Sequence, residues 1–153
     1  MTTELASYED EVTTRQQKVT ALESQLADYQ EELSQLAEES KEVQTQITAL
    51  NDQKAQHQGS QAQSRLVVDG PQATIQQLRK FSEQQAALRE VNQQLAEKEA
   101  EQQRITSYQT LTQAQLVHSE EQLATAKKEL QSQQEQLQQA QAQVQDLQEK
   151  VEL

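Results

Sequence analysis

Apolar residues recur along the first third of the chain with the spacing of a heptad repeat. The a positions hold Leu5, Val12, Val19, Leu26, Leu33, Ser40 and Ile47, and the d positions hold Tyr8, Arg15, Leu22, Tyr29, Leu36, Val43 and Leu50. Such a pattern predicts a long helix whose apolar face is buried by a neighbouring helix. The fold class we expect is all-α, in the form of a long coiled coil.

A second heptad frame begins at Phe81 and runs to the end of the chain. Its a positions hold Phe81, Leu88, Leu95, Gln102, Gln109, Leu116, Leu123, Leu130, Leu137, Val144 and Val151, and its d positions include Gln84, Val91, Lys98, Ile105, Thr112, Ser119, Ala126 and Leu147. A polar residue at an a or d position lowers stability but penalises wrong registers. We therefore expect the polar positions to set specificity, namely Arg15, Ser40, Lys98, Gln102 and Gln109.

The two frames are separated by a predicted helix break. The first frame loses its apolar residues from Lys54 onward, close to Gly59, and Asp69, Gly70 and Pro71 form a strong helix-breaking sequence. We expect a first helix over residues 1–58, a loop or break over 59–72 and a second helix over 73–153. The short apolar run Leu66–Val68 is interpreted either as a clasp that closes the loop over the helix ends or as a short extended segment.

Two long helices around one break predict an antiparallel hairpin. Registers in which paired residue numbers add to 124 or to 131 bury about as many apolar pairs. In the first of them Arg15 faces Gln109 and Ser40 faces Gln84. Either register leaves the chain from Leu123 onward as a C-terminal overhang without an internal partner, and homodimerisation would cover it.

The alternative is an extended parallel homodimer. Val12, Val19 and Ile47 at a positions, with leucine at d positions, are typical of parallel two-stranded coiled coils. The polar centre of the second frame, from Lys98 to Ser119, favours the hairpin, since identical polar residues stacked on themselves would weaken a parallel dimer.

One stretch of the second helix has a wider apolar face. Tyr108, Leu111 and Val117 lie outside the a and d positions and adjoin Ile105 and Leu116. A wider face is typical of a helix that packs against two neighbours, or of a local change of register. We expect this stretch to be the face offered to a partner protein.

Composition excludes a globular core and argues against several partners. The chain is 33% hydrophobic and 3% aromatic, is rich in glutamine, and contains no Cys. Its net charge of −12 repels phosphate groups and anionic lipid, so we expect no nucleic-acid binding and no direct membrane binding. The first 57 residues hold four Lys and Arg against twelve Asp and Glu, which would attract a basic protein. Because no signal peptide or membrane span is visible, we expect a cytoplasmic location.

The candidate chemistry is sparse. His57 and His118 are the two histidines, and neither has a second ligand at the helical spacing of a metal site. Acidic runs such as Glu9–Glu11 lack the glycine-containing loop of a calcium site. We therefore expect no metal, no cofactor and no enzymatic activity.

The pattern resembles the rod segments of filament-forming, tethering and scaffold proteins. Prefoldin, a two-helix hairpin chaperone, is similar in outline, but the Leu66–Val68 run is a poor match for the β-hairpins between its helices. We expect a non-enzymatic structural coiled-coil protein that self-associates as a scaffold, spacer or filament unit. The alternative is an adaptor that presents a helical face to a partner protein, such as another coiled coil or a basic protein.

Overall fold

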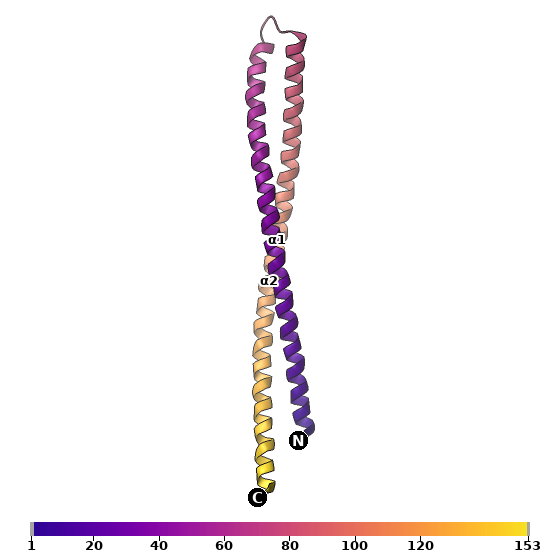
Figure 1. Ribbon diagram of the computed structural model, residues 1–153, viewed down its shortest axis with the longest axis vertical. Coiled ribbons are helices and arrows are strands. Elements are labelled where there is room, and N and C mark those ends of the chain that lie inside the picture. Colours follow the sequence, from indigo (N-terminus) through magenta and orange to yellow (C-terminus); the bar gives the residue numbers. More distant parts are fainter. Residues whose placement is uncertain (1, 153) are drawn as a thin grey trace. The chain divides into compact units, whose positions relative to one another are not determined.

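The computed structural model describes residues 2–152, and these residues form two α-helices and no strand. Helix α1 spans Thr2–Val68 and helix α2 spans Ile75–Glu152, and residues 69–74 join them as a short connection (Figure 1). The two helices pack against each other, which places the protein in the all-α class. Over the described residues, neither helix has a stretch apolar enough to cross a bilayer.

The contacts divide the chain into two compact units. The central unit comprises Ser34–Thr110, and the terminal unit comprises Met1–Leu33 and Leu111–Leu153. Each helix therefore contributes residues to both units.

Helix α1 is longer than the sequence predicts. It passes through Gly59 without interruption and ends at Val68 rather than near residue 58. A glycine within a helix costs about 1 kcal/mol relative to alanine, and helix-compatible neighbours can compensate for that cost. The run Leu66–Val68 forms the last turn of α1, so it is neither a clasp nor an extended segment.

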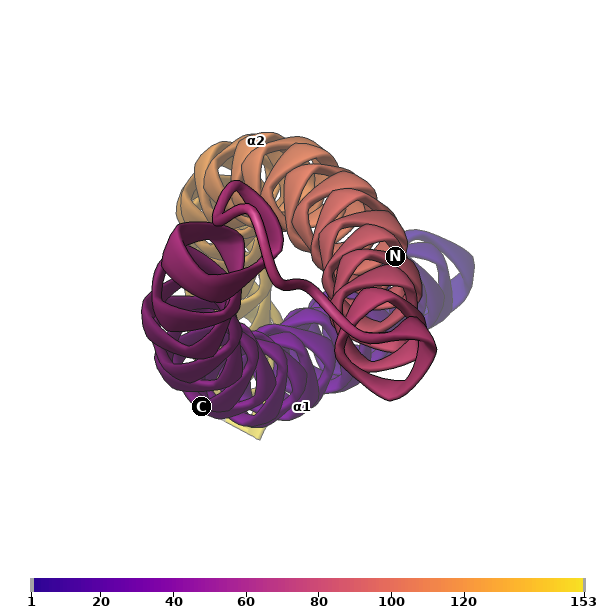
Figure 2. The same cartoon turned by 90° about the horizontal axis from the view of Figure 1, so that it is seen from above.

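Figure 2 shows the connection from above, where it links the end of α1 to the start of α2. Local hydrogen bonds form at both helix ends. Gly70 N donates to Val67 O at 3.1 Å. Pro71 has no N–H to donate and disfavours helical geometry in the residue before it, so the helix cannot continue. Helix α2 begins with a capping box: Gln77 N donates to Thr74 Oγ1 at 3.2 Å, and Thr74 N donates to Gln77 Oε1 at 2.9 Å.

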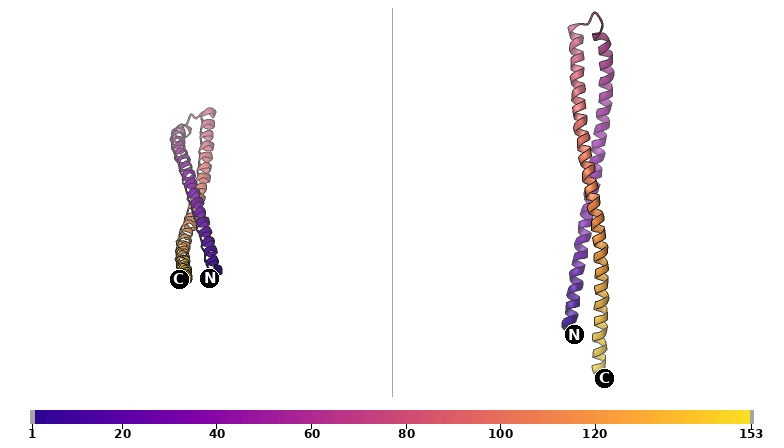
Figure 3. Two further views of the ribbon diagram at one scale, coloured as in Figure 1. Left: turned by 60° about the horizontal axis from the view of Figure 1, so that its bottom comes forward. Right: turned by 180° about the vertical axis from the view of Figure 1, so that it is seen from behind.

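The central unit is held by one apolar cluster between the two helices. Val43 and Ile47 of α1 are buried against Val91, Leu95 and Ile105 of α2. The half-buried side chains of Leu36 and Leu50 pack against this cluster. Both views in Figure 3 show the two helical segments of this unit side by side. All of these residues occupy a or d positions of the two heptad frames.

The terminal unit has its own apolar cluster. Val19 of α1 is buried with Leu123, Ala126 and Leu130 of α2, and the half-buried side chains of Val12, Leu22 and Leu26 pack against them. Ala126 is 2% exposed, and Thr112 and Ser119, at the two preceding d positions, are 3% exposed. Small side chains at d positions of α2 leave room for larger apolar side chains of α1.

The expected overhang from Leu123 onward is corrected by this cluster. Leu123 and Leu130 pack on α1, so the chain does contain a partner for them. Within the described chain from Leu123 onward, the large apolar residues that are exposed are Leu147, at 43%, and Val151, at 84%.

In the part of the chain that the structure describes, two side-chain hydrogen bonds join α1 to α2. In the central unit, Gln102 Nε2 donates to Ser40 Oγ at 2.7 Å. In the terminal unit, Arg15 Nη1 donates to Glu129 Oε2 at 2.5 Å. The paired residue numbers add to 142 and to 144 respectively.

These pairs differ from both registers considered from the sequence. Helix α1 ends at residue 68 and helix α2 begins at residue 75, and these two numbers add to 143. The two hydrogen-bonded pairs, at 142 and 144, lie on either side of this value. Because α1 continues past residue 58, the turn moves toward the C-terminus, and the pairings move with it. Ser40 consequently bonds Gln102 rather than facing Gln84.

Candidate functional site

The candidate site is the row of a and d positions along both helices. In α1 every predicted interface residue is buried or half-buried. These residues are Leu5, Val12, Arg15, Val19, Leu22, Leu26, Tyr29, Leu33, Leu36, Ser40, Val43, Ile47 and Leu50. In α2 the same holds for Phe81, Leu88, Val91, Leu95, Lys98, Gln102, Ile105, Gln109, Leu116, Leu123, Leu130, Leu137 and Val144, whereas Leu147 is exposed.

The row continues through polar residues where the apolar pattern stops. Lys54, His57, Gln61 and Ser64 occupy the next a and d positions of α1, and all four are half-buried. The a and d positions of α1 face α2 because of the helical phase, so they are covered whether the residue there is apolar or polar. The interface therefore becomes polar toward the connection.

The first polar contact of the interface is a charged one. Arg15 Nη1 contacts Glu129 at 2.5 Å, and Arg15 Nη2 contacts Glu11, one turn earlier on α1, at 3.4 Å. The side chains of Arg15 and Glu129 are 29% and 41% exposed, so water screens the pair and its net contribution to stability is small. The buried Nε of Arg15 has no hydrogen-bond partner.

The second polar contact is neutral. Gln102 donates to the hydroxyl of Ser40 at 2.7 Å, while the buried Oε1 of Gln102 has no partner. Lys98, in contrast, bonds within its own helix, to Glu101 at 3.3 Å. Of the polar residues expected to set register, Arg15, Ser40 and Gln102 are brought into contact between helices. Gln109 is half-buried.

The predicted partner face of α2 is divided in two. Ile105 and Leu116 are buried, at 6% and 8% exposure, and belong to the packing inside their own units. Tyr108, Leu111 and Val117 are exposed at 58%, 56% and 43%. The apolar face widens because interface residues and exposed residues alternate along this stretch of α2.

Two features near the connection differ from what the sequence predicts. The exposed apolar residues there are Leu66, Val67, Ile75 and Leu78, at 46–80% exposure. The capping box of Thr74 and Gln77 was also missed, although a threonine followed three residues later by glutamine is its sequence signature.

Metal-binding groups do not assemble in the described residues. Residues 2–152 contain no group of three or more His, Cys, Asp or Glu side chains that could hold a metal ion. His118 lines a shallow depression of the terminal unit with Lys18, Leu22 and Glu121. His57 lies half-buried on α1 of the central unit.

Comparison with known proteins adds no family to this description. No family model matches the chain, and no curated protein or solved structure is significantly similar to it.

Proposed function

We propose that this chain is a non-enzymatic structural protein, an antiparallel coiled-coil hairpin that self-associates and serves as a scaffold, spacer or filament unit. The observation that carries the proposal is the match between the heptad positions and the buried positions in both helices. Two further contacts support it, since Ser40–Gln102 and Arg15–Glu129 both fit a turn at residues 69–74. A parallel homodimer would not bring these residues together.

A pair of introduced cysteines tests the hairpin, because the chain contains no cysteine of its own. Ser40→Cys with Gln102→Cys should form a disulfide within one chain under mild oxidation, read as a faster-moving monomer on a non-reducing gel. The matched control is Ser40→Cys with Gln84→Cys, the pair of the alternative register. Faster closure of the control pair, or disulfides that form only between chains and vanish on dilution, would refute the proposed hairpin.

The magnitude of the disulfide effect is set by the loop that it closes. Ser40 and Gln102 are 62 residues apart, so the chain-entropy estimate gives about 4 kcal/mol of added stability, reduced by any strain in the bridge. Urea denaturation with and without reductant measures it. Self-association is tested separately, by sedimentation velocity of the wild-type chain over about a hundredfold range of concentration.

A second candidate function is an adaptor that binds a partner helix or a basic protein. The exposed side chain of Leu111, in the terminal unit, favours it. An adaptor would remain monomeric at every concentration until the partner is added, whereas a scaffold assembles alone. The same sedimentation series therefore separates the two functions.

A further inference from the structure

Four apolar side chains around the connection of the central unit are exposed to solvent. They are Leu66 at 80%, Val67 at 46%, Ile75 at 71% and Leu78 at 47%, and we call them the connection patch. They belong to the end of α1 and the start of α2. Grouped exposed apolar residues in a chain with so few of them are typical of an interaction site.

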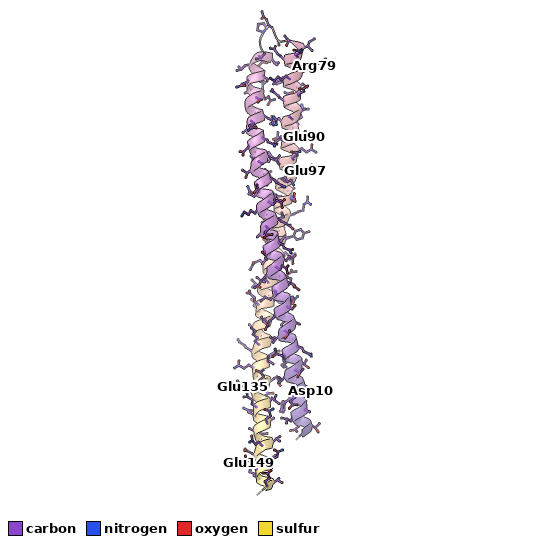
Figure 4. The ribbon with its side chains drawn as sticks, viewed as in Figure 1. Asp10, Arg79, Glu90, Glu97, Glu135 and Glu149 are labelled. Carbon is purple, nitrogen blue, oxygen red and sulfur yellow. The ribbon has the colours of Figure 1, made fainter. Side chains whose placement is uncertain are left out.

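The connection patch lies in the one basic stretch of an acidic chain. Residues 54–89 hold five Lys and Arg against two Asp and Glu, whereas the rest of the chain holds eight against 23. Arg79 and Lys80 follow Leu78 directly, and Figure 4 shows Arg79 beside the connection. A surface that is apolar and basic is complementary to one that is apolar and acidic.

The C-terminal part of α2, in the terminal unit, has such a surface. Val144, Leu147 and Val151 line a shallow groove, and we call them the C-terminal patch. All the residues that line this groove come from α2. Residues 144–152 carry three acidic side chains and one lysine, and Figure 4 shows Glu149 among them.

We propose that the connection patch of one copy docks on the C-terminal patch of a second copy. This inference rests on the proposed function, because it names the surfaces through which the chain would self-associate. The contact is heterologous, so each bound pair keeps one unused patch of each kind, and assembly continues from copy to copy. With so few apolar side chains the contact is small, and we expect a dissociation constant of about 10 µM or weaker.

Sedimentation velocity of glutamate variants tests the two patches. Leu66→Glu with Ile75→Glu alters the connection patch, and Leu147→Glu with Val151→Glu alters the C-terminal patch. Each pair should weaken self-association by about tenfold or more, while circular dichroism shows unchanged helicity because all four side chains are exposed. The control is Ala37→Glu, at an exposed position of α1 outside both patches, which should leave assembly unchanged.

Mixing the two defective variants tests whether the contact joins unlike patches. Each variant keeps one intact patch, so a mixture should form dimers that contain one molecule of each variant. Assemblies larger than a dimer should not form. Charge reversal gives a second test: Arg79→Glu with Lys80→Glu should weaken assembly, and adding Glu149→Lys with Glu152→Lys to the same chain should restore it.

Each contrary outcome overturns a different statement. If the wild-type chain assembles and neither patch variant weakens it, the docking contact is wrong and the proposed function stands. If only the connection variant weakens it, the contact joins two like patches, which also refutes the docking proposal. If the wild-type chain stays monomeric but sediments with phosphatidylserine vesicles, and the connection variant does not, the patch binds lipid. A chain that remains monomeric also removes the self-association on which the proposed function depends.

Discussion

Replacing Gly59 by alanine tests whether α1 is one continuous helix. The sequence suggests a break at Gly59, whereas the structure places it inside α1, nine residues before Val68. A Cβ atom built on Gly59 meets nothing within 4 Å, so the substitution neither adds a contact nor creates a clash. The expected gain is therefore the difference in helix propensity alone, about 0.5–1 kcal/mol.

Urea denaturation followed by circular dichroism measures this gain, at a concentration where the chain is monomeric. For a chain of this size it corresponds to a rise in Tm of about 1–4 °C. Gly70→Ala is the matched control in the connection, because its Cβ would lie 3.2 Å from the carbonyl oxygen of Val67, tighter than most such contacts. We expect no stabilisation from Gly70→Ala.

The reverse substitution completes the test. Ala62→Gly, at an exposed position of the same part of α1, should cost about as much as Gly59→Ala gains. If Gly59→Ala is neutral or destabilising while Ala62→Gly has no effect, this part of α1 is not a stable helix. The register around residues 68 and 75 would then lose its physical basis.

Three further substitutions probe the cap, the polar contacts and the core. Thr74→Ala removes the cap of α2 and should lower stability by about 1 kcal/mol in urea denaturation, and an unchanged value would show that the capping box is not formed. Arg15→Leu should raise Tm, because it replaces a screened ion pair and an unpaired buried Nε with apolar packing, whereas a lower Tm would mean that the contact with Glu129 stabilises the fold. Ile47→Ala should cost about 2–4 kcal/mol in the same assay, against little change for the exposed Leu66→Ala, and similar costs for both would place Ile47 outside the core.

The sequence was sufficient to identify the helices and the side of each that is buried. A seven-residue spacing of apolar residues depends only on helical phase, so Val43, Ile47 and Leu95 could be identified without knowing what they contact. The phase also extends to polar residues such as His57, where residue type alone suggests that the helix has ended.

The register of α1 against α2 could not be predicted, because two registers that differ by seven residues bury almost the same number of apolar pairs. The choice depends on where the turn lies, and that depended on Gly59, a residue that weakens a helix without necessarily ending it. The overhang followed from the same error, since the position of the turn decides that Leu123 and Leu130 are covered. Exposure at Leu66 follows from its place on the last turn of α1, and no periodic pattern indicates it.

The hydrogen bond between Ser40 and Gln102 has a consequence for how such a chain can change in length. In the proposed hairpin, deleting seven residues between Ser40 and the connection would keep the heptad phase of α1 but would bring Ser40 opposite Leu95. Deleting a second seven between the connection and Gln102 would restore the pair, and each helix would be shorter by about 10 Å. In the proposed hairpin, insertions and deletions would therefore keep the pairing only in matched sets of seven residues, one set in each helix, so the length of the hairpin would change in steps of one heptad.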